Sequence, residues 1–251
     1  MMNIIKSDEF VKTINSFSKL VNYDIFFIER NYFSNILKLQ EIIINDLDRE
    51  ENFHPITMNE LETEFNVNSE MIGIMAEYGL IAYHSVYFPN SDEREYNFGF
   101  DIALPSYEMD KVANIKAVMV HPKYRGHRLG YILNMLSLER LKNKGYNHIF
   151  ATVSPYNSDS LLMFMHSGFV IRNLKYKYGN KLRCIVYNDI TKNFSQIKYF
   201  GKEIFISNED IETQKKYLNE GYVGVDIRNI DNQYKIVYVN YLDHKTTRGG
   251  A

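Results

Sequence analysis

The 251-residue sequence contains no tryptophan, one cysteine and five prolines. A single cysteine excludes a disulfide within the chain and is typical of proteins from a reducing compartment. No apolar run approaches the roughly 20 residues of a membrane-spanning helix, and the first residues lack the basic start and long apolar stretch of a signal peptide. The formal net charge of −2 provides no general attraction to nucleic acids or acidic membranes. We therefore expect a cytoplasmic protein that binds neither nucleic acid nor membrane.

The composition is that of an ordinary globular protein. Hydrophobic residues make up 45% of the chain and charged residues 24%, and 20 tyrosines and 16 phenylalanines supply an aromatic core. Cys184 stands in a strand-like run, where burial is a more common role than nucleophilic chemistry. The seven histidines and the cysteine show no metal-ligand spacing. We expect no metal site.

One stretch joins a strand, a basic turn and a helix. Residues 115–120 are apolar except Lys116 and include the β-branched Ile115, Val118 and Val120, as in a buried strand, and His121-Pro122 ends this run. Residues 131–144 then carry apolar side chains at helical spacing. The turn between them contains glycines and basic residues, namely Lys123, Arg125, Gly126, His127, Arg128 and Gly130. Because the first N–H groups of a helix lack internal partners and lie at the positive end of its dipole, this arrangement favours binding of a phosphate group.

The turn, V-H-P-K-Y-R-G-H-R-L-G, resembles the acyl-CoA loop of the GNAT family of N-acetyltransferases, in which V-x-P is followed by R-G-x-G-[LI]-G. The resemblance implies that the backbone of the turn cradles the pyrophosphate of coenzyme A, and that the end of the strand pairs with the pantetheine amides. The implied cofactor residues here are Val118, Met119, Val120, Arg125, Gly126, His127, Arg128, Leu129 and Gly130. Arg128 stands where the family usually has its middle glycine. Its side chain could crowd the pyrophosphate or add a cation beside it.

A second segment, N-S-D-S-L-L-M-F-M-H-S-G-F, begins at Asn157 and resembles the family pattern N-x-x-A-x-x-L-Y-x-x-x-G-F. The resemblance implies that Asn157 contacts the coenzyme A arm, together with Ser160 and Phe164 of the same helix. Asn157 also suits the N-cap of that helix, and both roles are compatible.

Together the two motifs imply an α/β (α+β) fold of the GNAT type, with a central, mixed, mostly antiparallel twisted sheet flanked by helices. We expect an N-terminal helical extension at residues 1–22, the acyltransferase domain at 23–189 and a β-α-β-β extension at 190–251. Sequence patterns predict helices at 7–21, 35–47, 58–65, 131–144 and 158–167, and strands at 23–29, 70–77, 80–88, 115–120, 147–153, 170–178 and 181–189. Residues 89–112 show no clear periodicity.

The extension itself is predicted as a strand at 197–206, a helix capped by Ser207 and a hairpin of 222–228 and 234–241. No motif in it carries chemistry. It could form an added layer, a substrate lid or a contact in a homodimer.

The resemblance implies direct transfer of an acetyl group from acetyl-CoA to a primary amine of a small molecule or peptide in a ternary complex. Such an enzyme holds the thioester near the amine and stabilises the developing oxyanion, here with a strand N–H of Met119 or Val120. The acidic segment 92–110 suits a cationic acceptor.

The general base is not evident, because residues 113–120 contain no acid. Candidates are His84 on the preceding strand, which we expect to be half-exposed, Glu108 or Asp110 in the acidic segment, or a chain of waters.

The family's general acid is not evident either, because Phe164 stands where the family uses a tyrosine. Tyr156, Ser160 or Ser154 could protonate the leaving thiolate, or the thiolate could leave unaided. These departures keep open an alternative, a non-catalytic acyl-CoA-binding regulatory or interaction module of the same fold. An acetylase that acts on nucleic acid is disfavoured by the near-neutral charge.

Overall fold

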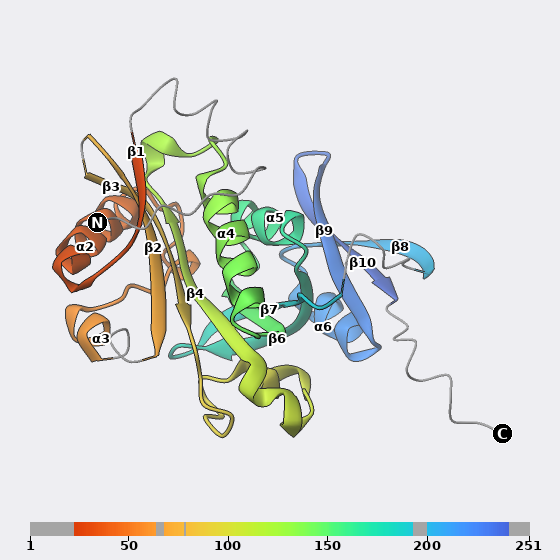
Figure 1. Cartoon of the computed structure of the whole chain (residues 1–251). Helices are drawn as coiled ribbons and strands as arrows, with labels where there is room; N and C mark the ends of the chain where they lie inside the picture. The colour runs from red at the N-terminus through yellow and green to blue at the C-terminus, as the bar shows by residue number, and fades with distance from the viewer. Residues whose placement is uncertain (1–22, 64–67, 78, 193–199, 241–251) are drawn as a thin grey trace. The chain divides into compact units, whose positions relative to one another are not determined.

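The computed structural model describes residues 23–63, 68–77, 79–192 and 200–240 (Figure 1). The helix predicted at 7–21 lies outside these residues. The chain divides into two compact units, of which the first ends at Ala151 and the second begins at Thr152. No helix among the described residues has the length and apolar character needed to cross a membrane.

The first unit is built on a mixed sheet with the strand order β1-β2-β3-β4-β5. Its strands are β1 (Tyr23–Phe27), β2 (Ser69–Ala76), β3 (Gly79–Tyr87), β4 (Val112–Val120) and β5 (His148–Val153), which runs across the boundary between the units. Neighbouring strands are antiparallel except β4 and β5, which are parallel. Parallel neighbours require a crossover connection, and a helix provides it here. The predicted mixed, mostly antiparallel sheet is confirmed.

Three α-helices flank this sheet: α2 (Phe33–Ile44), α3 (Met58–Thr63) and α4 (Leu129–Asn143). Short 3-10 helices connect them to the strands: η1 (Arg30–Tyr32), η2 (Glu50–Asn52), η3 (Phe98–Ile102), η4 (Ser106–Lys111) and η5 (Pro122–Tyr124). The segment 89–112, which shows no periodicity in sequence, is thus organised around two of these tight turns. Thr57 caps α3, since its Oγ1 accepts the N–H of Glu60.

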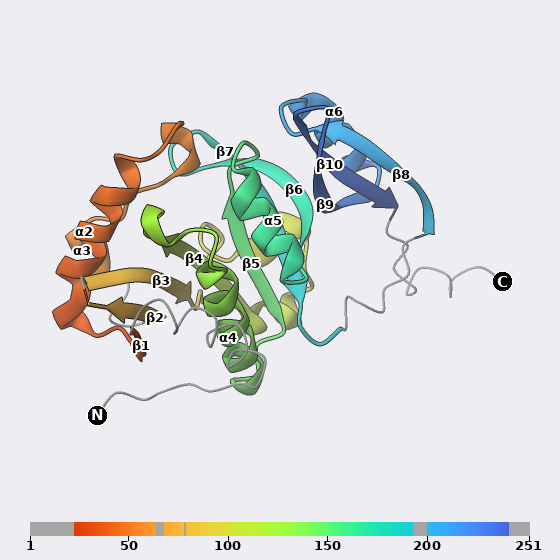
Figure 2. The ribbon, with the colours of Figure 1, turned by 90° about the horizontal axis from the view of Figure 1, so that it is seen from above.

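The helices of the first unit bury both faces of its sheet (Figure 2). One cluster joins α4 to the strands through Ile25, Ile72, Ile74, Ala82, Leu129, Ile132, Leu133 and Leu136. The other cluster joins α2 and α3 to the opposite face through Phe26, Phe33, Ile36, Leu39, Leu61, Met71, Tyr83 and Met119. With α4 fixed on one face, the turn before it is held at the end of β4.

The second unit contains an antiparallel sheet with the order β7-β6-β9-β10-β8. Its elements are α5 (Ser158–His166), β6 (Val170–Lys177), β7 (Lys181–Asp189), β8 (Phe200–Ser207), α6 (Ile211–Asn219), β9 (Tyr222–Ile230) and β10 (Gln233–Asn240). The predicted order of strand, helix and hairpin in the extension is confirmed. The predicted cap is wrong: Asp210, and not Ser207, accepts the N–H of Thr213 at the start of α6.

Candidate functional site

The turn between β4 and α4 has the backbone shape of an anion-binding site. The N–H of Arg125 donates to the Pro122 carbonyl at 3.1 Å, which closes η5. Gly126 and Arg128 then adopt positive φ angles of 81° and 60° on either side of His127. Alternation of φ sign turns successive N–H groups toward one side and forms a concave nest for an anion. The first turn of α4 follows directly and adds its own N–H groups.

Arg128 holds the conformation that favours glycine. It is the N-cap of α4, with φ 60° and ψ 17° in the left-handed region, and its side chain is exposed. This conformation is costly for a residue with a Cβ. Arg128 thus adopts a conformation that glycine, the residue of the family pattern, would adopt without this cost.

Gly130 allows α4 to approach β4 closely. A Cβ at this position would lie 3.3 Å from Cγ1 of Val118 and 3.6 Å from Cγ2 of Val120. The neighbouring Leu129 is buried in the core cluster that includes α4. The start of the helix is thus pinned against the end of the strand from which the turn departs.

The register of β3 and β4 decides which backbone groups of β4 face away from β3. The N–H of His121 donates to the Ile81 carbonyl at 2.8 Å. In an antiparallel ladder such bonded pairs alternate, so Met119, opposite Tyr83, also directs its N–H and C=O to β3. Val118 and Val120 direct theirs to the other side. Of the strand residues predicted to meet the cofactor, these two have backbone groups available for pairing with an amide.

Positive charge gathers at the turn. The pKa of His121 is lowered by burial and by the neighbouring Lys123 and Arg125. The guanidinium Nη1 of Arg125 lies 2.5 Å from Oδ2 of Asp46, which follows α2. Asp46 could not be predicted from the sequence as a partner of Arg125, because the two residues are 79 positions apart and no local pattern connects them.

His84 is fully buried on β3, with 1% of its surface exposed, so the expected half-exposed side chain is wrong. Its Nε2 lies 3.2 Å from Oδ1 of Asn134 on α4. Within the described part of the chain, its Nδ1 has no hydrogen-bond partner. Burial lowers the pKa of His84 to about 4. The side chain is therefore a neutral imidazole near pH 7.

Glu108 lies in η4, at the opposite end of β4 from the glycine turn. Its Oε2 is 3.1 Å from Nε2 of His148 and 3.2 Å from Nζ of Lys111. The hydrogen bond from His148, followed by that from Lys111, lowers the pKa of Glu108. The carboxylate is thus held by an ion pair with Lys111 and a hydrogen bond with His148.

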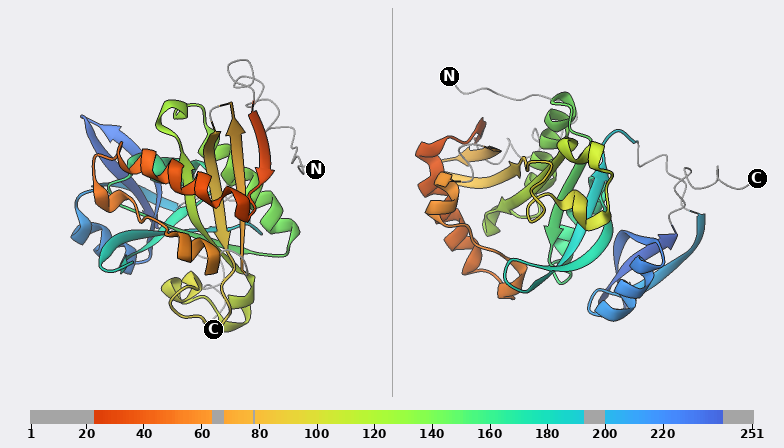
Figure 3. Two further views of the ribbon diagram at one scale, coloured as in Figure 1. Left: turned by 90° about the vertical axis from the view of Figure 1, so that its left-hand side faces the viewer. Right: turned by 90° about the horizontal axis from the view of Figure 1, so that it is seen from below.

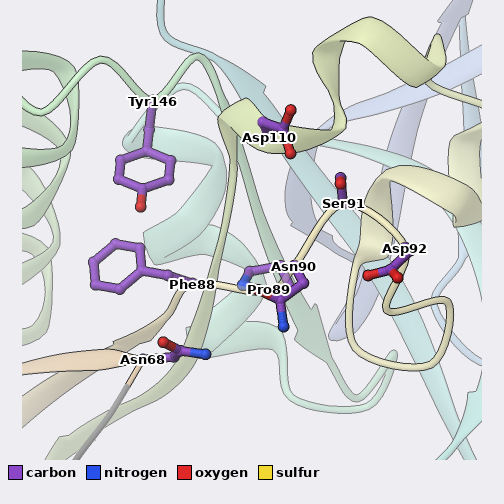
Figure 4. Close-up of a pocket in the computed structure, with 8 residues that line it drawn as sticks. All are labelled: Asn68, Phe88, Pro89, Asn90, Ser91, Asp92, Asp110 and Tyr146. Atoms are coloured by element: carbon purple, nitrogen blue, oxygen red, sulfur yellow. The ribbon is translucent and has the colours of Figure 1, made fainter.

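A cavity of about 560 Å³ opens at the same end of the first unit (Figure 4). It is lined by Asn68, Phe88, Pro89, Asn90, Ser91, Asp92, Asp110 and Tyr146. Figure 3 shows the segment that carries the acidic lining beyond the ends of β2 and β3. The rings of Phe88 and Tyr146 stack with centroids 4.9 Å apart. Glu93 does not line the cavity, because its carboxylate accepts hydrogen bonds from the Tyr87 hydroxyl and the Asn90 N–H.

The other predicted site residues lie in the second unit. Asn157 caps α5 as expected, since its Oδ1 accepts the N–H of Ser160 at 3.1 Å. The N–H of Tyr156 donates to Oγ of the buried Ser154 at 3.3 Å. The ring of Phe164 is buried and packs edge-on against Phe169, with centroids 5.0 Å apart. Their contacts with a cofactor and their part in proton transfer remain predictions.

Comparison with solved structures shows the same fold at low sequence identity. A structure of smu.2055 from Streptococcus mutans UA159 superposes with a TM-score of 0.51 and 15% identity, covering 66% of this chain and 99% of that one. An N-acetyltransferase from Staphylococcus aureus Mu50 gives a TM-score of 0.48 and 16% identity over 66% of this chain and 96% of that one. A PaiA N-acetyltransferase from Thermoplasma acidophilum, solved with coenzyme A, gives a TM-score of 0.45 and 12% identity over 67% of this chain and 99% of that one.

The sequence comparisons locate the family within the chain. A search of curated protein sequences finds no match. The model of the acetyltransferase (GNAT) family matches residues 39–169, which is more than half of the sequence and includes the strand β4, the glycine turn and all of α5. The chain belongs to the GNAT acetyltransferase family.

Proposed function

We propose that this protein is an N-acyltransferase that transfers an acetyl group from acetyl-CoA to a primary amine of a small molecule or peptide. The observation that carries the proposal is the turn between β4 and α4. Its φ angles are positive at Gly126 and Arg128 on either side of His127 and form a nest, its basic residues add positive charge, and Gly130 brings α4 against the strand. These features fit the diphosphate of coenzyme A.

The residues of β4 fit the remaining arm of the cofactor. Val118 and Val120 have backbone groups on the side away from β3, where an extended chain with two amides can pair with them. Acetyl-CoA supplies the acyl group as a thioester. We assign the oxyanion to the N–H of Val120 or Val118, and no longer to Met119, because the N–H of Met119 faces β3. From the second unit we retain Asn157, Ser160 and Phe164 as proposed contacts of the coenzyme A arm.

Two protons must move in the reaction. The attacking amine loses one as its nitrogen bonds to the acyl carbon, and the sulfur gains one as the C–S bond breaks. For the first, we retain His84 and Glu108 as candidate bases, although His84 is buried and weakly basic and Glu108 is held by Lys111 and His148. For the second, Tyr156 or Ser160 supplies a hydroxyl. A pH–rate profile of His84→Gln and Glu108→Gln identifies the base, since the profile loses its acidic limb only in the variant that lacks it.

The test of the proposed function is release of free coenzyme A thiol when the protein is mixed with acetyl-CoA and each member of a panel of primary amines. We expect turnover with at least one amine, and a loss of kcat/KM in Arg125→Ala. Binding of acetyl-CoA without thiol release from any amine would overturn the enzyme assignment and leave the non-catalytic binding module.

A further inference from the structure

The second unit contains the same arrangement twice. α5 is followed by the hairpin of β6 and β7, and α6 is followed by the hairpin of β9 and β10; each helix has nine residues and is preceded by a strand (Figures 1 and 2). Such an element order recurs in many proteins, so the order alone does not show a repeat. The atomic details decide the question.

The starts of the two helices correspond residue by residue with an offset of 53 positions, so that Asn157 is equivalent to Asp210 and Ser160 to Thr213. Each cap accepts the N–H three residues later at 3.1 Å. The cap angles are φ −91°, ψ 77° in the first copy and φ −83°, ψ 75° in the second. The preceding serines also match, since Ser154 and Ser207 each accept the N–H two residues later at 3.3 Å.

The helix ends match with the same separation. Gly168 and Gly221 both have φ 87°. The aromatic pairs Phe164–Phe169 and Tyr217–Tyr222 are edge-on, each with ring centroids 5.0 Å apart. The ladder of each hairpin shifts at the same place, at Arg172 in the first copy and Val225 in the second. We conclude that residues 200–240 are a second copy of the strand, helix and hairpin that end at residue 189.

The two copies contact each other through equivalent positions. β6 pairs antiparallel with β9 at Ile171 and Gly224, which are again 53 residues apart. A second contact joins Asn208 to Pro155, also 53 residues apart, through an Nδ2–H that donates to the carbonyl at 3.2 Å. Contacts between equivalent positions define a local two-fold axis, as in a symmetric dimer. The strand order β7-β6-β9-β10 is also symmetric, because in each copy the first strand of the hairpin lies beside the other copy and the second strand lies outside it.

We propose that the second copy takes the place of a partner chain. The edge of β6 is a surface that pairs with another unit of the same helix-and-hairpin structure, and β9 of the second copy provides this pairing within one chain. A free sheet edge pairs readily with another chain. With its β6 edge covered by β9, the chain does not pair with a second copy through that edge, and we expect a monomer of 29.6 kDa. The homodimer contact considered for the extension is thus replaced by a contact within one chain. This inference does not depend on acyl transfer.

The residues at the axis explain why β6 pairs with β9 and not with another β6. A Cβ added at Gly224 would lie 3.1 Å from atoms of both Ile171 and Ile236. The glycine thus leaves the room that the isoleucine occupies. Two β6 strands in the same register would place one Ile171 against another where there is room for one. A small residue facing a large one makes pairing within the chain the favoured arrangement.

A cysteine test on the full-length protein distinguishes the two pairings. Ile171→Cys alone places a thiol at the axis, and Ile171→Cys with Gly224→Cys places one on each copy; Cys184 is fully buried and does not compete. After mild oxidation we expect the double variant to form a disulfide within one chain and the single variant to remain a monomer on a non-reducing gel. A covalent dimer from the single variant, or reduced thiols in the double variant, would overturn the proposal.

Sedimentation equilibrium of the unmodified protein gives an independent readout. We expect a monomer mass throughout the micromolar range, whereas a dimer mass would overturn the proposal. Gly224→Ile alone should lower the Tm, and Ile171→Gly combined with Gly224→Ile should recover part of the loss, because the large and small residues are then exchanged across the axis. Additive losses would contradict the proposed complementarity. None of these results bears on whether the protein releases coenzyme A.

Discussion

The guanidinium of Arg125 is bound by the carboxylate of Asp46, with Nη1 and Oδ2 2.5 Å apart. Arg125 belongs to the turn that we propose binds the coenzyme A diphosphate, so Asp46 competes with the cofactor for the same cation. The pair also ties the turn to the segment that follows α2.

Asp46→Asn should therefore strengthen acetyl-CoA binding. Both side chains are nearly half-exposed, and such a pair contributes at most about 1 kcal/mol, which corresponds to an increase in affinity of up to about fivefold. Isothermal titration calorimetry measures the change. Asp48→Asn, which removes the same charge two residues away, is the matched control and should leave the Kd unchanged. Equal effects of both variants would show a general charge effect and contradict direct competition.

Arg128→Gly should stabilise the protein, because Arg128 holds a left-handed conformation with φ 60°. Relief of the clash of its Cβ is offset in part by the greater freedom of glycine in the unfolded chain, and we expect a gain of about 1 kcal/mol. Urea unfolding measures it. Arg128→Ala removes the same charge but keeps a Cβ, so it should give no gain; a similar gain in both variants would assign the effect to charge.

Acid should destabilise the protein through His84. Its pKa is about 4 in the folded protein and 6.5 ordinarily. Between these pH values His84 binds a proton in the unfolded chain but not in the folded protein. Stability is present above pH 6.5 and is lost as the pH falls toward 4, by about 1.4 kcal/mol per pH unit and about 3 kcal/mol in all.

Urea unfolding at pH 5 and pH 7.5 isolates this contribution. The difference in unfolding free energy between the two pH values should shrink in His84→Gln. It should stay as in the unmodified protein in His166→Gln, which alters an exposed histidine. An unchanged difference in His84→Gln would show that His84 does not cause the acid sensitivity.

The lining of the cavity identifies the acidic residues on which binding of a cationic acceptor can be tested. Asp92 and Asp110 line the cavity, whereas Glu93 is bound by the Tyr87 hydroxyl and the Asn90 N–H. If a cationic acceptor docks there, Asp92→Asn with Asp110→Asn should raise the acceptor KM about tenfold and leave kcat nearly unchanged. Glu95→Gln, an exposed change in the same segment outside the lining, is the control. An unchanged KM in the double variant would contradict binding of the acceptor in the cavity.

The local elements of the fold could be predicted from sequence, since their causes are local. The strand before His121, the positive φ of a glycine turn and the helix after Arg128 each follow from short-range patterns, and the predicted hairpin of 170–178 and 181–189 matches β6 and β7 closely. The N-cap at Asn157 is of the same kind.

Contacts between distant segments could not be predicted. His84 was expected to be half-exposed because a strand usually has one solvent face, but helices cover both faces of the sheet and every residue of β3 after Gly79 is buried. Asn134 meets His84 from 50 residues away, and nothing in its helical surroundings indicates this.

The repeat could have been recognised from sequence, yet its signal lies in residues that carry no chemistry. The matching positions are caps, a glycine and aromatic rings, while the helix faces differ: α6 has Gln214 where α5 has Leu161. Gln214 is buried and donates to the carbonyls of Ser207 and Asn208, so the second copy keeps the backbone plan with a different interior.

The measurement that tests the central claim most directly is calorimetric titration of the full-length protein with acetyl-CoA, repeated with Arg125→Ala. We predict saturable binding in the micromolar range that Arg125→Ala weakens at least about tenfold, as expected for the loss of a charged contact to phosphate. Absence of binding, or an affinity that Arg125→Ala leaves unchanged, would contradict the claim that the turn between β4 and α4 binds coenzyme A.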